Sequence, residues 1–452
     1  MQQKLKLAFS GGGFRAMFYA LGGYRRLVEC KLDQHVSSIS SVSGGSLTAA
    51  AIMISLYKEG PFRNVTDFEK RVVTPLVQLG QIDLRTKLIM HALTKQVLSW
   101  KSLRAKCSVA FPILLDQYLC QGINMKELKG LPIEWYCNTT CLNTMRMFYF
   151  SQDHMYGTLI GQTDNIDDIS ISYAVSTSAA FPLLFAPIPL PAEQKEFSDP
   201  QGRMQGKPLL KYDKLWFSDG GVFDNIGTEP LILPDGEQNH DNQQRYRPLA
   251  KHRKEPMKFM PKKLNEYYII LDASAAEDIW RKEHKPTYIG LGERILNTSN
   301  SQIVILRRKM LYNLDPNIYP GLQLILSKPI KSLLNPNNNY FYSNERPLPD
   351  YRLQPYTSAC DRNNIENLLG GLRTDLDGFH DSEISTLMRA GEIRMDIALR
   401  MLLPNYMDNL KGVPIPKFPA ENQEHIIKIL QEGRKHRITG SLFYKLHDKK
   451  AH

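Results

Sequence analysis

The chain has 452 residues, of which 42% are hydrophobic and 23% are charged, and its formal net charge is +11. This ordinary globular composition excludes a disordered or fibrous chain and provides enough apolar sequence for a sizeable core. The positive charge favours a polyanionic partner, either nucleic acid or an anionic membrane leaflet, without choosing between them. Six cysteines without a Cys-x-x-Cys pair argue against a redox or zinc site and favour reduced thiols in a cytoplasm.

No stretch of the sequence predicts a membrane-spanning helix. The longest uncharged stretch, 169–192, holds four prolines, which would break a spanning helix. No signal peptide is expected either, because the apolar run near the N-terminus stops at Ser10 and three glycines. Any contact with lipid is therefore expected from the surface.

The first sixty residues predict a βαβ unit. Residues 4–9 alternate like a strand, and apolar residues at helical spacing follow over 14–28. Residues 36–42 predict a second strand and 47–57 a second helix, so we expect a parallel sheet. Residues 60–130 are mostly helical in pattern and contain no recognisable chemistry.

The rest of the chain predicts more strands and two long helices. Strands are expected at 145–150, 215–218 and 267–271, a helix of small residues at 171–180, and further helices at about 382–403 and 421–436. Residues 234–262 are polar and predict a surface insertion.

Three glycines, Gly11, Gly12 and Gly13, separate the first strand from the first helix. Their N–H groups lie at a helix N-terminus and can hold a phosphate or an oxyanion. The spacing Gly11-x-Gly13-x-x-Ala16 also fits a dinucleotide fingerprint, but no acidic residue ends the second strand. A P-loop is excluded because no Gly-Lys-Ser/Thr follows.

Ser43 lies in Ser41-Val42-Ser43-Gly44-Gly45, at the junction of the second strand and second helix. A nucleophile elbow belongs at such a junction, because a sharp turn between small residues exposes the serine hydroxyl. Ser41 replaces the first glycine of the usual Gly-x-Ser-x-Gly. The N–H of Gly44 is expected to join an oxyanion hole. The alternative is a Ser/Gly turn that only caps a helix.

Asp219 precedes two glycines and directly follows a predicted strand. Its carboxylate can reach a site across this tight turn, although Asp-Gly is also common in plain turns, and Asp213 and Asp224 are nearby alternatives. No motif places a histidine at the same sheet edge, since His35 precedes the second strand and His154 lies in a polar loop. A Ser/Asp dyad is therefore preferred over a Ser-His-Asp triad.

Together the glycine loop with Arg15, the Ser43 elbow and the Asp219 turn resemble the patatin-like phospholipases. Segments 176–182 and 221–225 are similar to those that flank the family's aspartate, and 373–377 resembles bacterial members with an extended C-terminal region. The resemblance covers roughly residues 4–60 and 145–275. It implies an α/β fold, a three-layer α/β/α sandwich with a mainly parallel central sheet.

The resemblance also implies roles for single residues. Ser43 would attack an acyl ester, Asp219 would activate it, and Gly11, Gly12, Gly13 and Gly44 would form the oxyanion hole. Arg15 would bind substrate, by meeting a lipid phosphate or by orienting the glycine loop. No cofactor is required, and no metal is expected, because the chain lacks His-Glu-x-x-His and a calcium loop.

The implied organisation is a catalytic domain, 1–280, and a C-terminal extension, 281–452, that packs on it or regulates it. The catalytic domain would carry a helical insertion at about 60–140 and the polar insertion at about 234–262. The basic stretch Lys251–Lys263, with Met257, Phe259 and Met260 interleaved, is expected to dock on membranes, and a basic C-terminal cluster is the second candidate.

The expected function is hydrolysis of membrane phospholipid acyl esters, as a phospholipase or lysophospholipase A. The alternatives are an acyltransferase or thioesterase with the same dyad, or a non-catalytic lipid-binding module. Some bacterial members are anti-phage effectors, which adds a nucleotide activator and an oligomer to the expected partners. The expected location is cytoplasmic, peripheral at the inner membrane surface, without a nucleic-acid partner.

Overall fold

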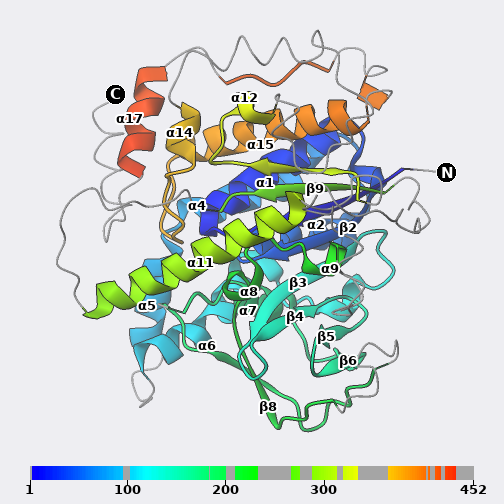
Figure 1. The fold of residues 1–452 in the computed structure, drawn as a ribbon, viewed down its shortest axis with the longest axis vertical. Helices are drawn as coiled ribbons and strands as arrows, with labels where there is room; N and C mark the ends of the chain where they lie inside the picture. Colours follow the sequence, from blue (N-terminus) through cyan, green and yellow to red (C-terminus); the bar gives the residue numbers. More distant parts are fainter. Residues whose placement is uncertain are drawn as a thin grey trace, which may run out of the picture.

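The protein is an α/β/α sandwich, in which a central sheet lies between two layers of helices (Figure 1). The computed structural model describes residues 3–94, 102–182, 184–199, 209–232, 266–274, 288–312, 319–333, 365–403, 406–407, 413–418 and 423–433. The predicted three-layer fold is confirmed.

Five parallel strands form one half of the sheet, in the order β10-β9-β1-β2-β3. Their bounds are β1, Lys4–Phe9; β2, Val36–Val42; β3, Glu134–Cys141; β9, Glu266–Asp272; and β10, Gly321–Ile325. At the centre, Leu7 of β1 pairs with Ile39 of β2 and Ile269 of β9. Because these strands are parallel, the loops after β1 and β2 leave from the same edge of the sheet.

An antiparallel half continues from β3, so the sheet as a whole is mixed, and the prediction that it is mainly parallel is wrong. β3 pairs with both β4 and β8; β4 leads on to β5 and β6, and β8 pairs with β7. The bounds are β4, Arg146–Phe150; β5, Met155–Gly157; β6, Gly161–Thr163; β7, Ile188–Pro191; and β8, Lys214–Asp219. The pairing of β8 with β3 brings Asp219 opposite Thr139, at the carboxyl end of the parallel strands.

Helices connect and cover these strands. The α-helices are α1, Gly13–Glu29; α2, Gly44–Glu59; α3, Val65–Phe68; α4, Thr74–Gln81; α5, Leu84–Thr94; α6, Leu103–Leu115; α7, Ile171–Ser178; α8, Gly221–Asp224; α9, Glu229–Ile232; α11, Tyr288–Tyr312; α12, Ile330–Leu333; α14, Ile365–Leu369; α15, Asp381–Leu402; and α17, Gln423–Gly433. Short 3-10 or π segments are η1, Asp33–His35; η2, Glu69–Val73; η3, Asp116–Cys120; and η4, Met125–Leu128. The described residues of 60–130 are thus mostly helical, as their pattern predicts, but the helical insertion expected at about 60–140 ends before β3, which begins at Glu134.

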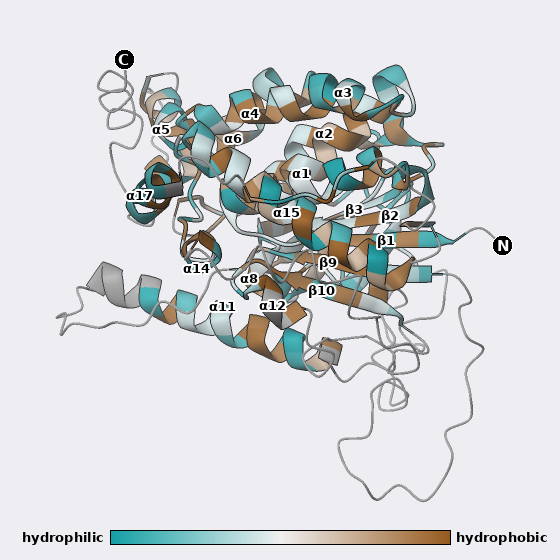
Figure 2. Cartoon of the chain, turned by 90° about the horizontal axis from the view of Figure 1, so that it is seen from above, coloured by the Kyte–Doolittle hydropathy of each residue, from teal (hydrophilic) through white to brown (hydrophobic). Residues whose placement is uncertain are grey.

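The two faces of the sheet bury separate apolar cores, because side chains alternate along each strand. In β9, Ile269 and Leu271 join the large core under α1 and α15, while Tyr268 and Ile270 join a smaller core with Val304 of α11. Figure 2 shows α1, α2 and α15 on one side of the sheet and α11 on the other. Of the helices in the described part of the chain, none has the length and apolar character that crossing a bilayer requires.

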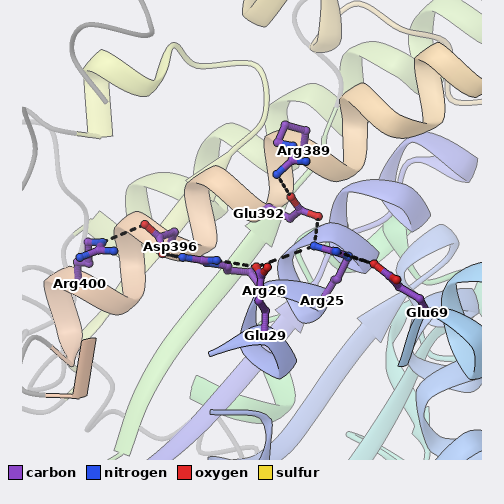
Figure 3. A network of polar contacts seen from close by, with 8 residues as sticks. All are labelled: Arg25, Arg26, Glu29, Glu69, Arg389, Glu392, Asp396 and Arg400. Carbon is purple, nitrogen blue, oxygen red and sulfur yellow. Dashed lines mark hydrogen bonds and ion pairs between the residues drawn. The ribbon is translucent and has the colours of Figure 1, made fainter. Parts of the chain in front are cut away.

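Helix α15, from the C-terminal third, packs directly on α1. The two backbones are so close that a Cβ on Gly391 would overlap the carbonyl of Tyr19. Ion pairs reinforce the contact (Figure 3). Arg26 Nη2 lies 2.5 Å from Asp396 Oδ1, and both side chains are almost fully buried. Since a buried charge is costly without its partner, this pair fixes how α15 lies on α1.

Replacing Asp396 by Ala should lower the free energy of unfolding by up to about 3–5 kcal/mol, because it removes the buried carboxylate that Arg26 meets on α15 and leaves only Glu29, on its own helix, as a partner. Urea denaturation of the full chain measures the loss. Arg389→Ala is the control, since Arg389 is 38% exposed and its pair with Glu392 should contribute at most about 1 kcal/mol. Equal losses in both variants would contradict a special role for the buried pair.

Candidate active site

The glycine loop follows β1 and turns directly into α1. Gly12 has a φ of 137° and Gly13 a φ of 56°, values that residues with a side chain rarely adopt. A Cβ on Gly13 would also overlap the carbonyl of Thr374. The loop is therefore held between the sheet edge and a segment more than 350 residues away in the sequence.

Ser43 occupies the sharp turn between β2 and α2. Its φ of 51° and ψ of −119° form a strained combination for a residue other than glycine. A Cβ on Gly44 would overlap the carbonyl of Gly13, and one on Gly45 would lie 2.6 Å from the carbonyl of Phe9. This is the backbone of a nucleophile elbow, in which crowding by small residues leaves the serine hydroxyl at the tip of the turn.

Asp219 ends β8, and its carboxylate meets Ser43. Asp219 accepts a hydrogen bond from the N–H of Gly221 at 2.7 Å, and the Ser43 hydroxyl lies near enough to favour its ionised form. Burial raises the pKa of Asp219 to about 6, against the opposing effect of these two groups. A carboxylate with this pKa is ionised at neutral pH and more basic than an exposed one, as a general base requires.

No histidine joins this pair in the part of the chain that the structure describes. The His35 ring lies 3.0 Å from the carbonyl of Gln3, His154 lies 3.0 Å from the Tyr149 hydroxyl, and His380 caps α15. The described residues likewise include no group of three or more His, Cys, Asp or Glu side chains that could hold a metal ion. Among the described residues, the carboxylate of Asp219 is therefore the candidate proton acceptor for the Ser43 hydroxyl.

A chain of buried hydroxyls supports the elbow from beneath. The N–H of Ser43 donates to Ser178 Oγ, Ser178 Oγ contacts Ser46 Oγ, and Ser46 Oγ contacts Ser41 Oγ, each at 2.9 Å. Trp135 Nε1 closes the chain by donating to Ser41 Oγ at 2.9 Å. Ser178 therefore connects the end of α7 to the strained turn, a role that no motif in the sequence indicated.

One of the four glycines predicted for the oxyanion hole has to be withdrawn. The N–H of Gly11 donates to the carbonyl of Asn225 at 2.9 Å, so it is already used. Among the described residues, the N–H groups of Gly12, Gly13 and Gly44 have no such acceptor. Because Gly13 packs against Gly44, these three donors lie together next to Ser43.

Arg15 is not placed to bind substrate. It is 1% exposed, and its guanidinium donates to the carbonyls of Gly370, Leu372 and Ala273 at 2.5–3.1 Å. Burial lowers the pKa of Arg15 to about 10, so it stays charged at neutral pH. The predicted contact with a lipid phosphate is therefore corrected: Arg15 ties the glycine loop to the C-terminal segment that borders it.

The segment 370–377 packs against the glycine loop. Arg373 holds it in shape, with its Nη1 2.6 Å from Glu383 Oε1 and its Nε 2.5 Å from Asp377 Oδ1. Thr374, whose carbonyl packs on Gly13, is exposed. The motif that resembles bacterial members of the family thus lies at the site, and its charged residues are structural supports.

The two alternative aspartates have other places. Asp224 accepts hydrogen bonds from the N–H groups of Ile226, Thr228 and Glu229 at 2.8–3.1 Å and so caps the turn before α9. Asp213 is exposed beyond the opposite end of β8. The two basic clusters predicted to dock on membranes, Lys251–Lys263 and the C-terminal one, lie outside the described residues.

Replacing Ser178 by Ala should reduce turnover of an activated ester by about tenfold or more, because the N–H of Ser43 and the hydroxyl of Ser46 lose a buried partner worth about 1–3 kcal/mol. Steady-state kinetics measure the effect. Ser176→Ala is the matched control, since the buried Ser176 hydroxyl, on the same helix, has no partner among the described residues. Similar losses in both variants would assign the effect to helix packing.

The chain is similar to known proteins in its family motifs and, distantly, in its structure. No curated protein matches the sequence. Among solved structures, the chain is similar to human GIVD cytosolic phospholipase A2, with 12% identity and a TM-score of 0.43 over 96% of this chain and 61% of that one. It is also similar to VipD from Legionella pneumophila, with 12% identity and a TM-score of 0.28 over 100% of this chain and 87% of that one. The chain thus spans less than two thirds of the length of the human enzyme.

The family model described as patatin-like phospholipase matches residues 7–232. The matched region contains the glycine loop, Ser43 and Asp219. It makes up half of the chain, and the protein therefore belongs to the patatin-like phospholipases, a family of lipid ester hydrolases.

Proposed function

We propose that this protein is a serine lipid acyl hydrolase, of the phospholipase or lysophospholipase A type, that cleaves acyl esters of membrane phospholipids through Ser43 and Asp219. The observation that carries the proposal is the approach of the Ser43 hydroxyl, at the tip of its strained turn, to the buried Asp219 carboxylate. It joins the two motifs that define the catalytic region of the family, and it pairs a strained, accessible hydroxyl with a base of suitable pKa.

In the first step, Ser43 Oγ attacks the carbonyl carbon of the ester while Asp219 takes its proton. The carbonyl electron pair moves to oxygen, and the N–H groups of Gly12, Gly13 and Gly44 stabilise this negative charge. When the carbonyl re-forms, the bond to the lipid alcohol breaks, and the alcohol takes the proton from Asp219. The products are the free alcohol and an acyl ester on Ser43.

In the second step, Asp219 takes a proton from water, and the hydroxide formed attacks the acyl ester. Collapse of this second tetrahedral intermediate releases the fatty acid and returns the proton to Ser43. An alcohol acceptor in place of water would make the same site an acyltransferase, and a thioester substrate would make it a thioesterase. The substrate of the family favours lipid hydrolysis with a peripheral position at a membrane surface.

Ser43→Ala should reduce hydrolysis of a short-chain ester to background, and Asp219→Asn should reduce it about 100-fold or more, the scale of general base catalysis. Asp224→Asn is the control, since its carboxylate caps a turn, and it should lower thermal stability while most of the activity remains. Near-normal activity of Ser43→Ala would refute a serine mechanism.

The activity on a water-soluble ester should rise about tenfold per pH unit below pH 6 and level off above it, because only ionised Asp219 accepts the proton of Ser43. The inflection should disappear in the residual activity of Asp219→Asn.

Because burial raises the pKa of Asp219 in the folded state, its ionisation destabilises the fold as the pH rises through 6. Asp219→Asn should therefore unfold at an equal or higher temperature than the wild type at pH 7.5, and activity that falls with rising pH would contradict the assignment.

Lipid analysis of membranes incubated with wild type and with Ser43→Ala tests the substrate class. Loss of diacyl phospholipid with a matching gain of fatty acid, seen only with the wild type, is the expected result. The comparison should be made with and without added nucleotides, since the anti-phage role implied by bacterial members would appear as hydrolysis that requires a nucleotide. Transfer of acyl chains to another alcohol without free fatty acid would favour the acyltransferase.

A further inference from the structure

Helices α5 and α6 pack against each other and present an outward face with an unusual composition. Their inner faces are apolar, with Leu84 and Leu88 of α5 and Phe111 and Leu115 of α6 fully buried. A helix that covers a core normally has a polar opposite face. The outer faces of these two helices depart from that rule.

Five of the thirteen large hydrophobic side chains exposed among the described residues lie on α5 and α6. They are Met90 at 59%, Leu93 at 54%, Ile113 at 49%, Leu103 at 44% and Val109 at 42% exposure. Lys87, Met90 and Leu93 are spaced by three residues, so they are neighbours on one face of α5. Val109 and Ile113 lie one turn apart and are neighbours on α6. Such a concentration of exposed apolar side chains indicates a surface that meets a partner.

The charge of the same helices indicates the kind of partner. Neither helix contains an Asp or a Glu, and each contributes one exposed basic residue, Lys87 of α5 and Arg104 of α6. Arg85 and Lys106 add positive charge but are partly buried, and Arg85 is paired with Asp375. Apolar side chains mixed with basic ones, without acidic ones, suit an anionic lipid surface, where chains bury in the interface and cations meet headgroups. A second copy of this chain fits less well, because a two-fold interface would bring the basic faces together.

Helix α5 adjoins the glycine-loop side of the active site. The N–H of Arg85 donates to the carbonyl of Leu376 at 3.2 Å, and the Arg85 side chain pairs with Asp375. The carbonyl of Asp375 in turn accepts the N–H of Phe14, in the first turn after the glycine loop. The face of α5 is thus connected to the oxyanion loop through one short segment.

Helix α6 adjoins the Asp219 side of the site. Arg104 Nη2 donates to the carbonyl of Phe185 at 2.9 Å, and Ser108 Oγ donates to the carbonyl of Ala186 at 2.7 Å. A few residues earlier in the same segment, the carbonyl of Ala180 accepts the N–H of Asp219. The two helices are therefore each joined by hydrogen bonds to a segment that borders the site, α5 on the glycine-loop side and α6 on the Asp219 side.

We propose that the outer face of α5 and α6, formed by Met90, Leu93, Val109 and Ile113 with the neighbouring basic residues, is the surface through which the enzyme docks on an anionic bilayer. The inference rests on the proposed lipid hydrolase function and adds where the membrane lies. Docking through this face would hold the enzyme on the bilayer that contains its proposed phospholipid substrate.

The test replaces Met90, Leu93, Val109 and Ile113 together by Gln in the full chain. The matched control replaces four other exposed apolar residues, Leu142, Met145, Ile295 and Leu306, by Gln. Binding to vesicles of phosphatidylcholine with a minority of phosphatidylglycerol is measured by sedimentation in a Ser43→Ala background, so that hydrolysis cannot alter the vesicles. Hydrolysis of a water-soluble ester is measured in chains that retain Ser43, and circular dichroism checks the fold.

The four-residue variant on α5 and α6 should bind the vesicles at least tenfold more weakly than its parent, while the control variant binds like the parent. Binding of the parent should weaken with salt and on pure phosphatidylcholine. Both variants should hydrolyse the soluble ester like the wild type. If the protein binds vesicles through this face but hydrolyses no ester, the docking surface is supported and only the proposed hydrolase function is refuted.

Equal vesicle binding by the α5 and α6 variant and its parent would overturn the proposal. So would a change of that variant from oligomer to monomer with vesicle binding unaltered, since the face would then join two copies of the chain. A wild type that hydrolyses the soluble ester but binds no anionic vesicle would overturn the proposal and leave the dyad intact.

Discussion

The close packing of three backbone segments is the constraint on which the rest of this structure depends. Gly13 lies between Gly44 and Thr374. A Cβ on Gly44 would overlap the carbonyl of Gly13, and a Cβ on Gly13 would overlap the carbonyl of Thr374. The packing pushes Ser43 into a strained turn and places the N–H groups of the glycine loop beside it. The proposed nucleophile and the proposed oxyanion donors are thus positioned together, by close contacts that only glycine allows.

Crowding of this kind also determines the electrostatics of the site. It buries Asp219, whose pKa rises to about 6 and makes the carboxylate a stronger base. It buries Arg15 as well, which is satisfied by three backbone carbonyls, two of them from the C-terminal third. Since α15 is fixed on α1 by the Arg26–Asp396 pair, residues near both ends of the described chain maintain the same site.

Features formed by residues close together in the sequence could be predicted, whereas contacts between residues far apart in the sequence could not. Strand, loop and helix signals around Gly11–Gly13 and Ser43 are contiguous, so the α/β fold and the elbow could be predicted. The Ser43–Ser178 hydrogen bond spans 135 residues and the Arg15–Gly370 bond 355, and no spacing rule reaches that far. For the same reason Gly11 was assigned to the oxyanion hole, although Asn225, far along the chain, uses its N–H. Strand β3, buried along most of its length, lacked the alternation that predicted its neighbour β4.

The central claim is that Ser43 is a nucleophile activated by Asp219 without a histidine. Labelling with a fluorophosphonate, followed by peptide mass spectrometry, tests it most directly, because the reagent modifies only activated serines. A single adduct on Ser43 is expected, formed faster as the pH rises through 6 and about 100-fold more slowly in Asp219→Asn. An adduct on another residue, or labelling of Ser43 at an unchanged rate in Asp219→Asn, would contradict it.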